Sequence, residues 1–300
     1  MLAALVPRLG GFASYPVLSS VPSTALRNFS AAAVTTDNSL QVVLEPLDGI
    51  DEGIFLLSLS RPAARNSIGR QLLRELRECL YTVAQERTTR CVVVRSTVPR
   101  VFCAGADLKE RAGMTQMEAA TFVRELREAF AQLDSLPMPT VACVDGYALG
   151  GGAELALACD LRVCGRDAQF AFPETRLGII PGAGGTQRLP RIIGKSKAKE
   201  LIYTGRRIDM HDALRIGLAD HAADDSPAED VALRVAREIA QGGPVALRLA
   251  KQAISLGLEV DLHSGMKLEE ACYAQVIPTR DRLEGLAAFA EKRQPKFTGE

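Results

Sequence analysis

Residues 148–159 read Ala148-Leu149-Gly150-Gly151-Gly152-Ala153-Glu154-Leu155-Ala156-Leu157-Ala158-Cys159, a glycine turn that leads into an apolar helix. Glu154 is the only charged residue in this stretch. An unpaired carboxylate in apolar surroundings costs several kcal/mol, so such a residue is paired, turned towards water or kept for chemistry. A second carboxylate, Glu174, ends another apolar run, Phe170-Ala171-Phe172-Pro173. Two carboxylates with separately tuned environments are the usual equipment for acid–base work on a small molecule, so we predict that both are catalytic.

Strands and helices alternate on both sides of this stretch. Strands are expected at Gln41–Leu44, Gly53–Leu59, Cys91–Val94, Thr140–Val144, Leu161–Cys164 and Gln169–Phe172. Asn66 or Ser67 can cap a first helix, whose apolar face is Ile68, Leu72, Leu73, Leu76, Leu80 and Val83. Thr115 and Glu118 have the spacing of a capping box for a second helix, which Pro137 and Pro139 end. This recurrence of two strands and a helix predicts an α/β core over residues 37–228.

The C-terminal region, residues 229–300, is expected to be helical. Four helices are predicted, at Glu229–Gln241, at Pro244–Leu256, in a segment that ends at Ala274, and at Thr279–Lys292. A helical tail with few strands needs a surface to pack on, so we expect it to pack on the core or on a neighbouring subunit.

The first 36 residues differ in composition from the rest. They contain Arg8 and Arg27, many Ser and Ala residues, and no Asp or Glu. This composition is typical of a mitochondrial transit peptide, and Arg27-Asn28-Phe29-Ser30 resembles a processing site with cleavage near Phe29. The alternative is a disordered tail. Pro16 and Pro22 interrupt the uncharged run from Leu9 to Leu26, which is therefore not predicted to span a membrane.

Composition excludes several classes of function. Lys and Arg total 36, as do Asp and Glu, so there is no electrostatic case for nucleic acid or an anionic membrane surface. The seven cysteines are odd in number and include no C-x-x-C, which indicates buried free thiols in a reducing compartment. Cys103 stands beside a glycine turn, where a reactive thiol is an alternative to a packing role. His211, His221 and His263 do not cluster, so no metal site is expected.

Two glycine-rich turns follow expected strands: Phe102–Asp107 after Cys91–Val94, and Gly150–Gly152 after Thr140–Val144. Glycine lets backbone N–H groups approach a ligand closely, and a helix N-terminus presents unpaired N–H groups. Two such turns on neighbouring strands can aim two N–H groups at one oxygen, which predicts an oxyanion hole. The alternative is that the glycines only permit tight turns.

Other sequence signatures are absent. Neither turn is G-x-G-x-x-G, and Gly194-Lys195-Ser196 lacks the first glycine of a P-loop because position 189 is Leu. No G-x-S-x-G supports a serine hydrolase. The loop Pro181–Thr186 is expected to shape the wall beside Glu174.

Four motifs resemble the enoyl-CoA hydratase (crotonase) family. They are Phe102–Glu110, Ala148–Glu154, Pro173-Glu174 and Ile180–Leu189, and the likeness covers residues 41–300. The tail Ile277–Gly285 is most similar to the mitochondrial branch that includes methylglutaconyl-CoA hydratase.

The resemblance implies a crotonase-like spiral of ββα repeats, with a helical C-terminal region that builds a homotrimer or homohexamer in the mitochondrial matrix. It implies that the backbone N–H groups of Ala106 and Gly151 hold the carbonyl of an acyl-CoA thioester. It also implies substrate-binding positions, which are Ala104, Asp107, Leu108 and Lys109. No metal or redox cofactor is implied, because coenzyme A is part of the substrate.

The resemblance assigns Glu154 as the base that activates water and Glu174 as the proton donor to the α-carbon. Family members that isomerise double bonds often keep one of these acids. Having both favours hydration, because one group must deprotonate water while another delivers a proton.

Several alternatives stay open. The hydratase could act on 3-methylglutaconyl-CoA specifically, or the fold could serve an isomerase, a thioester hydrolase or a decarboxylase. Ala153, Phe170 and Phe172 depart from the family pattern and could reshape the acyl pocket. A purely structural trimer would leave both acids without a role.

An RNA-binding module is the rival from another class. The helix expected over Gln71–Gln85 carries Arg74 and Arg77 balanced by Glu75 and Glu78, and no Lys. Because the positive charge is balanced, we predict no specific RNA binding.

Overall fold

The computed structural model describes residues 40–300. The transit peptide expected over residues 1–36 and its cleavage near Phe29 therefore lie outside the described residues.

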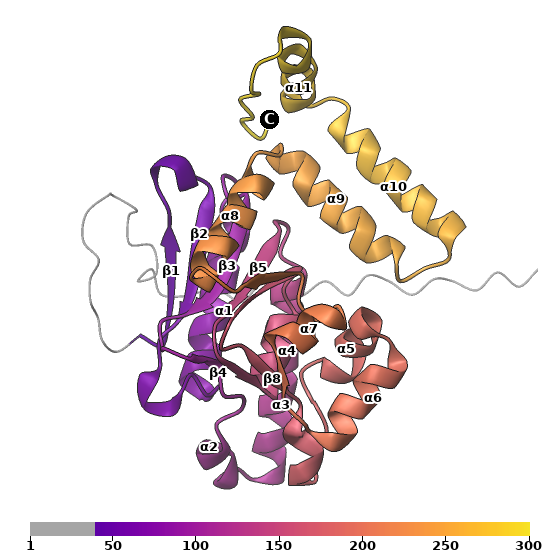
Figure 1. Ribbon diagram of the computed structural model, residues 1–300. Helices are drawn as coiled ribbons and strands as arrows, with labels where there is room; N and C mark the ends of the chain where they lie inside the picture. Colours follow the sequence, from indigo (N-terminus) through magenta and orange to yellow (C-terminus); the bar gives the residue numbers. More distant parts are fainter. Residues whose placement is uncertain (1–39) are drawn as a thin grey trace, which may run out of the picture. The chain divides into compact units, whose positions relative to one another are not determined.

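A six-stranded sheet forms the larger layer of strands (Figure 1). Its strands, in spatial order, are β1 (Val42–Pro46), β2 (Ile54–Leu59), β3 (Cys91–Ser96), β5 (Thr140–Val144), β7 (Leu161–Gly165) and β10 (His221–Ala223). The β1–β2 pair is antiparallel and every other pair is parallel. Every residue of β2 and β5 is buried, as expected for strands covered on both faces.

A second sheet of short strands lies beyond the first. Its order is β4 (Val101–Cys103), β6 (Tyr147–Leu149), β8 (Gln169–Ala171) and β9 (Ile208–Asp209). Three of these strands come shortly after β3, β5 and β7 along the chain, so the repeat is one long strand, one short strand and a helical segment. The predicted α/β repeat is therefore confirmed. Sequence reasoning missed β4, β6 and β9, because two or three residues are too few to show an alternating pattern.

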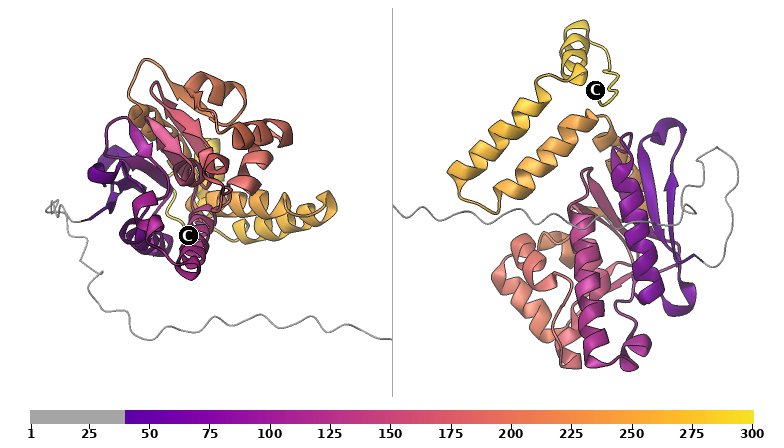
Figure 2. Two further views of the ribbon diagram at one scale, coloured as in Figure 1. Left: turned by 90° about the horizontal axis from the view of Figure 1, so that it is seen from below. Right: turned by 180° about the vertical axis from the view of Figure 1, so that it is seen from behind.

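Helices cover both faces of the larger sheet. Along the chain they are η1 (Gly49–Asp51), η2 (Pro62–Ala64), α1 (Arg70–Gln85), α2 (Leu108–Ala112), α3 (Gln116–Asp134), α4 (Gly151–Leu157), η3 (Pro173–Leu177), α5 (Gly185–Ile193), α6 (Lys195–Thr204), α7 (Met210–Arg215) and α8 (Ala228–Ala240). Alternate residues of β3 serve two cores: Val92 and Val94 join the larger one with α1 and α3, and Val93 joins the smaller one with α8. Figure 2 shows α1 and α3 side by side.

The first long helix begins later than predicted. Neither Asn66 nor Ser67 caps it, since α1 begins at Arg70 with Gly69 as its N-cap. Asn66 is fully buried at a positive φ of 53°. Its side chain accepts the Arg61 N–H at 2.7 Å and donates to the Phe102 carbonyl at 3.0 Å. Asn66 therefore ties a loop to β4. The capping box of Thr115 and Glu118 is confirmed at the start of α3.

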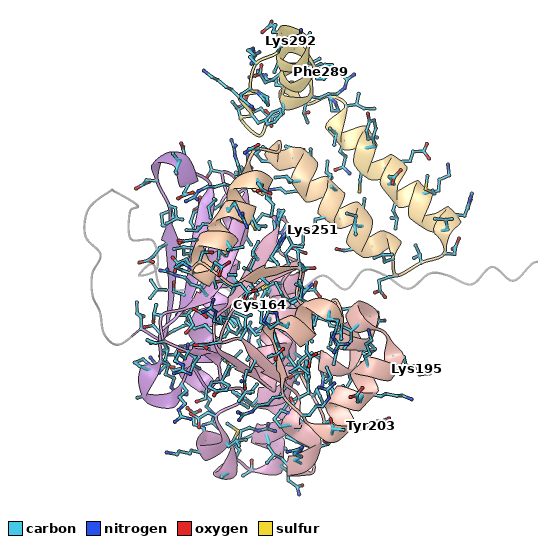
Figure 3. All side chains as sticks on the ribbon, viewed as in Figure 1. Cys164, Lys195, Tyr203, Lys251, Phe289 and Lys292 are labelled. Atoms are coloured by element: carbon cyan, nitrogen blue, oxygen red, sulfur yellow. The ribbon has the colours of Figure 1, made fainter. Side chains whose placement is uncertain are left out.

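The C-terminal helices follow the expected pattern. After α8 come α9 (Pro244–Gly257), α10 (Leu262–Val276) and α11 (Arg280–Glu291), and α9 and α10 pack side by side (Figure 2). Lys251 of α9 donates to the Asp160 carboxylate at 2.7 Å and to the Met138 carbonyl at 3.1 Å. Large apolar side chains on these helices are exposed, among them Phe289, which is 85% exposed (Figure 3).

The cysteines are free thiols, as predicted, and all except the half-buried Cys79 are buried. The Cys103 thiol donates to the Asn66 carbonyl at 3.0 Å, and burial raises its pKa to about 12. A buried thiol with such a pKa is neutral at physiological pH, which favours a packing role for Cys103 over a reactive one. Among the helices of residues 40–300, none is long and apolar enough to cross a membrane.

Close backbone packing at Gly152 yields a stability prediction. A β-carbon there would lie 2.1 Å from the Cys103 carbonyl oxygen, and neither backbone can move freely. Gly152→Ala should therefore destabilise the fold by about 1–3 kcal/mol, the scale of overpacking. Gly113→Ala is the matched control, since its nearest contact would be an ordinary 3.8 Å. Urea unfolding at one protein concentration measures both, and equal midpoints for the two variants would contradict the prediction.

Candidate active site

The two glycine turns meet at one edge of the short sheet. They follow β4 and β6, which are parallel neighbours, rather than the longer strands named from the sequence. Gly105 has a φ of 92°, and a β-carbon on it would lie 2.6 Å from the Leu149 carbonyl oxygen. With Gly152 against Cys103, this gives two points where backbone touches backbone. Glycine is required at both, because any side chain would push the turns apart.

Two N–H groups come together between these turns. Ile68 exchanges hydrogen bonds with the residues on either side of Ala106, from its N–H to the Gly105 carbonyl and from the Asp107 N–H to its own carbonyl. The N–H of Ala106 therefore points away from Ile68. Gly151 is the first residue of α4, so its N–H has no acceptor within that helix. A β-carbon on Gly151 would lie 3.6 Å from the Ala106 nitrogen, so both donors can serve one oxygen.

Glu154 lies in α4, on the same short helix as Gly151. It is 3% exposed, and its Oε1 accepts the N–H groups of Ala183 at 2.9 Å and Gly185 at 2.8 Å. Burial raises the pKa of Glu154, and these two hydrogen bonds oppose that rise, as do the charges of Arg188 and Arg127. The carboxylate is thus a stronger base than an exposed one, with one of its oxygens fixed in place.

The loop Pro181–Thr186, expected to shape the wall beside Glu174, also supplies hydrogen bonds to Glu154. Its Ala183 and Gly185 N–H groups are the donors just described, and a β-carbon on Gly185 would lie 3.0 Å from Glu154 Oε1. The sequence did hold a signal for this role: Gly185 begins α5, and a glycine at a helix start offers an unpaired N–H.

Glu174 lies in η3 and is 8% exposed. A β-carbon on Gly150 would lie 3.0 Å from its Oε1, so the carboxyl group abuts the turn that precedes Gly151. Its Oε2 is buried and finds no hydrogen-bond partner among the described residues. Burial raises the pKa of Glu174 to about 7; its own backbone N–H opposes the rise and the charge of Glu154 adds to it. Near neutral pH, Glu174 therefore exists in both protonation states.

The other expected site residues cluster at the turn after β4. Ala104 is half-buried, and its N–H donates to the Arg65 carbonyl at 3.1 Å. Leu108 and Lys109 begin α2 and are exposed beside the turn. Asp107 is 8% exposed and caps α2 by accepting the N–H groups of Lys109 and Glu110.

The carboxylate of Asp107 has a structural partner that sequence reasoning missed. Arg61 Nη1 lies 2.8 Å from its Oδ2. Although burial raises the pKa of Asp107, the Glu110 N–H and Arg61 outweigh that effect and lower it. The side chain therefore holds the turn in place, and it is the backbone beside it that faces the site.

The three departures from the family pattern lie in the core. Ala153, Phe170 and Phe172 are between 0% and 1% exposed. They therefore act on a pocket only through the residues that cover them. Exposed apolar side chains follow Glu174 directly instead, at Leu177, Ile179 and Ile180.

The prediction of no specific RNA binding was based on the balanced charges of the helix that the structure shows as α1. Two of its three arginines pair with carboxylates on α3: Arg70 lies 3.0 Å from Glu118, and Arg77 lies 4.0 Å from Glu128. A groove of about 690 Å³ lies between these helices, with both basic and acidic side chains along it. Within residues 40–300, no three His, Cys, Asp or Glu side chains gather as metal ligands would.

Comparison with known proteins agrees with this geometry. The sequence profile of the family described as enoyl-CoA hydratase/isomerase matches residues 49–300. A probable mitochondrial enoyl-CoA hydratase 2 of Arabidopsis thaliana is 49% identical over 258 residues, which are 86% of each chain. Human mitochondrial methylglutaconyl-CoA hydratase is 47% identical over 278 residues, covering 91% of this chain and 81% of the relative.

A solved structure shares the fold. The enoyl-CoA hydratase of Bacillus anthracis superposes with a TM-score of 0.84 at 46% identity, covering 87% of this chain and all of that one. The matched region includes both glycine turns, Glu154 and Glu174. The predicted crotonase-like fold is confirmed, and this chain belongs to the enoyl-CoA hydratase/isomerase family.

Proposed function

We propose that this protein is an enoyl-CoA hydratase, a hydro-lyase that adds water across the 2,3 double bond of a 2-enoyl-CoA thioester. One observation carries the proposal: two buried carboxyl groups in different environments lie beside a pair of convergent N–H donors. Acid and base chemistry at neutral pH needs two such groups, with pKa values set by separate surroundings.

The N–H groups of Ala106 and Gly151 receive the thioester oxygen. As water adds to C3, the electrons of the C2–C3 double bond move towards the carbonyl and charge grows on this oxygen. Donors already aimed at that oxygen favour the transition state over the substrate, and one such donor is worth about 3 kcal/mol in other enzymes.

The two carboxyl groups move the protons. Ionised Glu154 takes a proton from the attacking water as its oxygen bonds to C3, and protonated Glu174 gives a proton to C2. Glu154 then releases its proton to solvent and Glu174 regains one, which completes the cycle. Glu154 Oε1 already holds two N–H groups, so the base presents its other oxygen to the water.

The relatives do not decide which acyl group the protein accepts, so the proposal for the acyl group rests on the side chains near Glu174. Relatives named enoyl-CoA hydratase and those named methylglutaconyl-CoA hydratase are similarly close, at 49% and 47% identity. The apolar side chains of Leu177, Ile179 and Ile180 beside Glu174 support an uncharged acyl chain. Fatty-acid or branched-chain amino-acid breakdown supplies such thioesters.

We further propose a homotrimer or homohexamer in the mitochondrial matrix. Exposed apolar residues on α9–α11 support assembly, because such surface is normally covered by a partner. The mitochondrial names of several relatives and the acid-free leader support the location. No metal or redox cofactor enters the proposed reaction, and coenzyme A enters as part of the substrate.

A substrate panel tests the reaction class. With crotonyl-CoA, the enoyl-thioester absorbance should fall without release of free CoA, because hydration removes the double bond and keeps the thioester. Crotonyl-CoA and tiglyl-CoA should be turned over faster than 3-methylglutaconyl-CoA, whose second carboxylate meets apolar side chains. Free CoA release would indicate a hydrolase, and a shifted double bond without water uptake an isomerase.

Substitution of either acid tests its role. Glu154→Gln and Glu174→Gln should each lower kcat by about 10²-fold or more, the scale of general acid–base catalysis. Glu52→Gln makes the same chemical change at an exposed position and should leave kcat unchanged. Steady-state kinetics with crotonyl-CoA measure all three, and near-normal turnover in one acid variant would remove that residue from the mechanism.

The pKa of Glu174 predicts a pH profile. Since the protonated form is the donor, kcat/KM should fall as the pH rises above about 7. The free energy of unfolding should depend on pH as well. The pKa of Glu174 in the folded protein, about 7, exceeds the ordinary value for Glu, so the unfolded chain loses this proton at lower pH than the folded protein does. The wild type should therefore lose stability relative to Glu174→Gln as the pH rises from 5 to 8. Urea unfolding of both proteins at pH 5 and pH 8 checks the sign of this stability change. An alkaline limb of kcat/KM centred above pH 9 would contradict the prediction, because it would belong to another group.

A further inference from the structure

The peptide group between Gly182 and Ala183 is held at both ends by charge. Arg127, on α3, donates from Nε to the Gly182 carbonyl at 3.0 Å. The N–H of the same peptide group, that of Ala183, donates to Glu154 Oε1 at 2.9 Å. In a planar trans peptide the C=O and N–H point in opposite directions. A guanidinium and a carboxylate therefore face each other through one peptide group.

The next carbonyl along the loop is held as well. Arg188 donates from Nη1 to the Ala183 carbonyl at 3.1 Å, and Asp134 of α3 accepts from its Nε at 2.9 Å. Gly184 makes room for this arrangement: it has a φ of 117°, and a β-carbon there would lie 2.2 Å from Arg188 Nη1. Both arginines thus contact loop carbonyls, and the loop N–H groups contact Glu154.

We propose that Arg127 and Arg188 are positioning residues for the base. They fix the loop Gly182–Gly185 so that its N–H groups orient the Glu154 carboxylate and stabilise its ionised form. This inference rests on the proposed role of Glu154 in hydration. Neither arginine is assigned to contact the substrate; both act through the backbone of the loop.

The physical basis is the chain of hydrogen bonds. Bonds in which one partner is charged are roughly twice as strong as neutral ones. A carbonyl that accepts from a guanidinium polarises its peptide group, which strengthens the N–H at the other end as a donor. Loss of Arg127 leaves that N–H weaker and the loop freer to move. Glu154 then holds its proton more tightly.

The charges around Glu154 come from several elements. Arg127 of α3 and Arg188 of α5 lower the pKa of Glu154. Glu174, in η3, lies close enough that the charge of Glu154 raises the pKa of Glu174. Of the strands packed against α4, β4 carries Cys103, whose thiol is neutral because burial raises its pKa to about 12. The two arginines are therefore the cations that oppose the rise in the pKa of Glu154 that burial causes.

The experiment compares Arg127→Met with Arg127→Lys and with Arg124→Met. Arg124 lies on the same helix, is exposed and pairs with Glu128 at 3.8 Å, so its variant removes the same charge one turn away from the loop contact. The measurement is kcat/KM for crotonyl-CoA from pH 4.5 to 8, with kcat and KM separated at each pH.

Arg127→Met should move the acidic limb upward by about half a pH unit or more, because removing a nearby cation raises the pKa of a carboxyl group. At neutral pH, kcat should fall several-fold while KM stays within about twofold, since substrate contacts are unchanged. Arg127→Lys should restore most of the limb, and Arg188→Met should move it in the same direction as Arg127→Met. Arg124→Met should match the wild type.

Two results would overturn the inference while leaving the proposed function intact: an unshifted limb in Arg127→Met, or an equal shift in Arg124→Met. A wild type that does not hydrate crotonyl-CoA would instead defeat the proposed function. If Arg127→Met fails to fold, as judged by circular dichroism, Arg127→Lys decides. Arg127→Lys keeps the positive charge, so the acidic limb of its kcat/KM profile should stay near that of the wild type. A limb displaced as far as in Arg188→Met would contradict the proposal that the charge of Arg127 acts on Glu154.

Discussion

The carbonyl of Cys103 and the α-carbon of Gly152 touch so closely that no side chain fits between them, since a β-carbon would lie 2.1 Å from the oxygen. Gly105 makes the reciprocal contact with the Leu149 carbonyl. These two contacts bring the turns after β4 and β6 together, and they place the N–H groups of Ala106 and Gly151 side by side. Glu154 follows three residues after Gly151 on the same short helix, so the same packing also positions the proposed base.

The buried carboxyl groups set the second constraint, because each loses water on folding and must be compensated or left neutral. Glu154 receives two backbone N–H groups, and two arginines support the loop that supplies them. Glu174 has a buried oxygen with no hydrogen-bond partner within residues 40–300, and burial raises its pKa to about 7. Burial therefore raises the pKa of both carboxyl groups, but two N–H groups and two arginines oppose the rise at Glu154, whereas only its own backbone N–H opposes it at Glu174. This difference suits the proposed reaction, in which one group acts as base and the other as acid.

Sequence reasoning was strongest where a pattern ran over many residues. The helical faces of α1 and α3, the buried strands β2, β3 and β5, and the four C-terminal helices all carry long apolar repeats, and all were predicted. It failed where a few residues decide a structure through distant contacts. Asn66 looked like a helix cap but is buried and bound to Phe102, and the hydrogen bonds from the loop Pro181–Thr186 to Glu154 were not foreseen. The short strands β4 and β6 left no pattern to detect.

By itself, the sequence determined the α/β class, the two candidate acids and the two glycine turns, because glycines in a turn and lone charges in apolar runs have few physical explanations. Only the tertiary structure decided how these parts meet. The pairing of β4 with β6 aligns the turns, and residues 29 and 31 positions beyond Glu154 supply its hydrogen bonds. The separate protonation of Glu154 and Glu174 depends on burial and partners, which are properties of the folded chain and not of either residue alone.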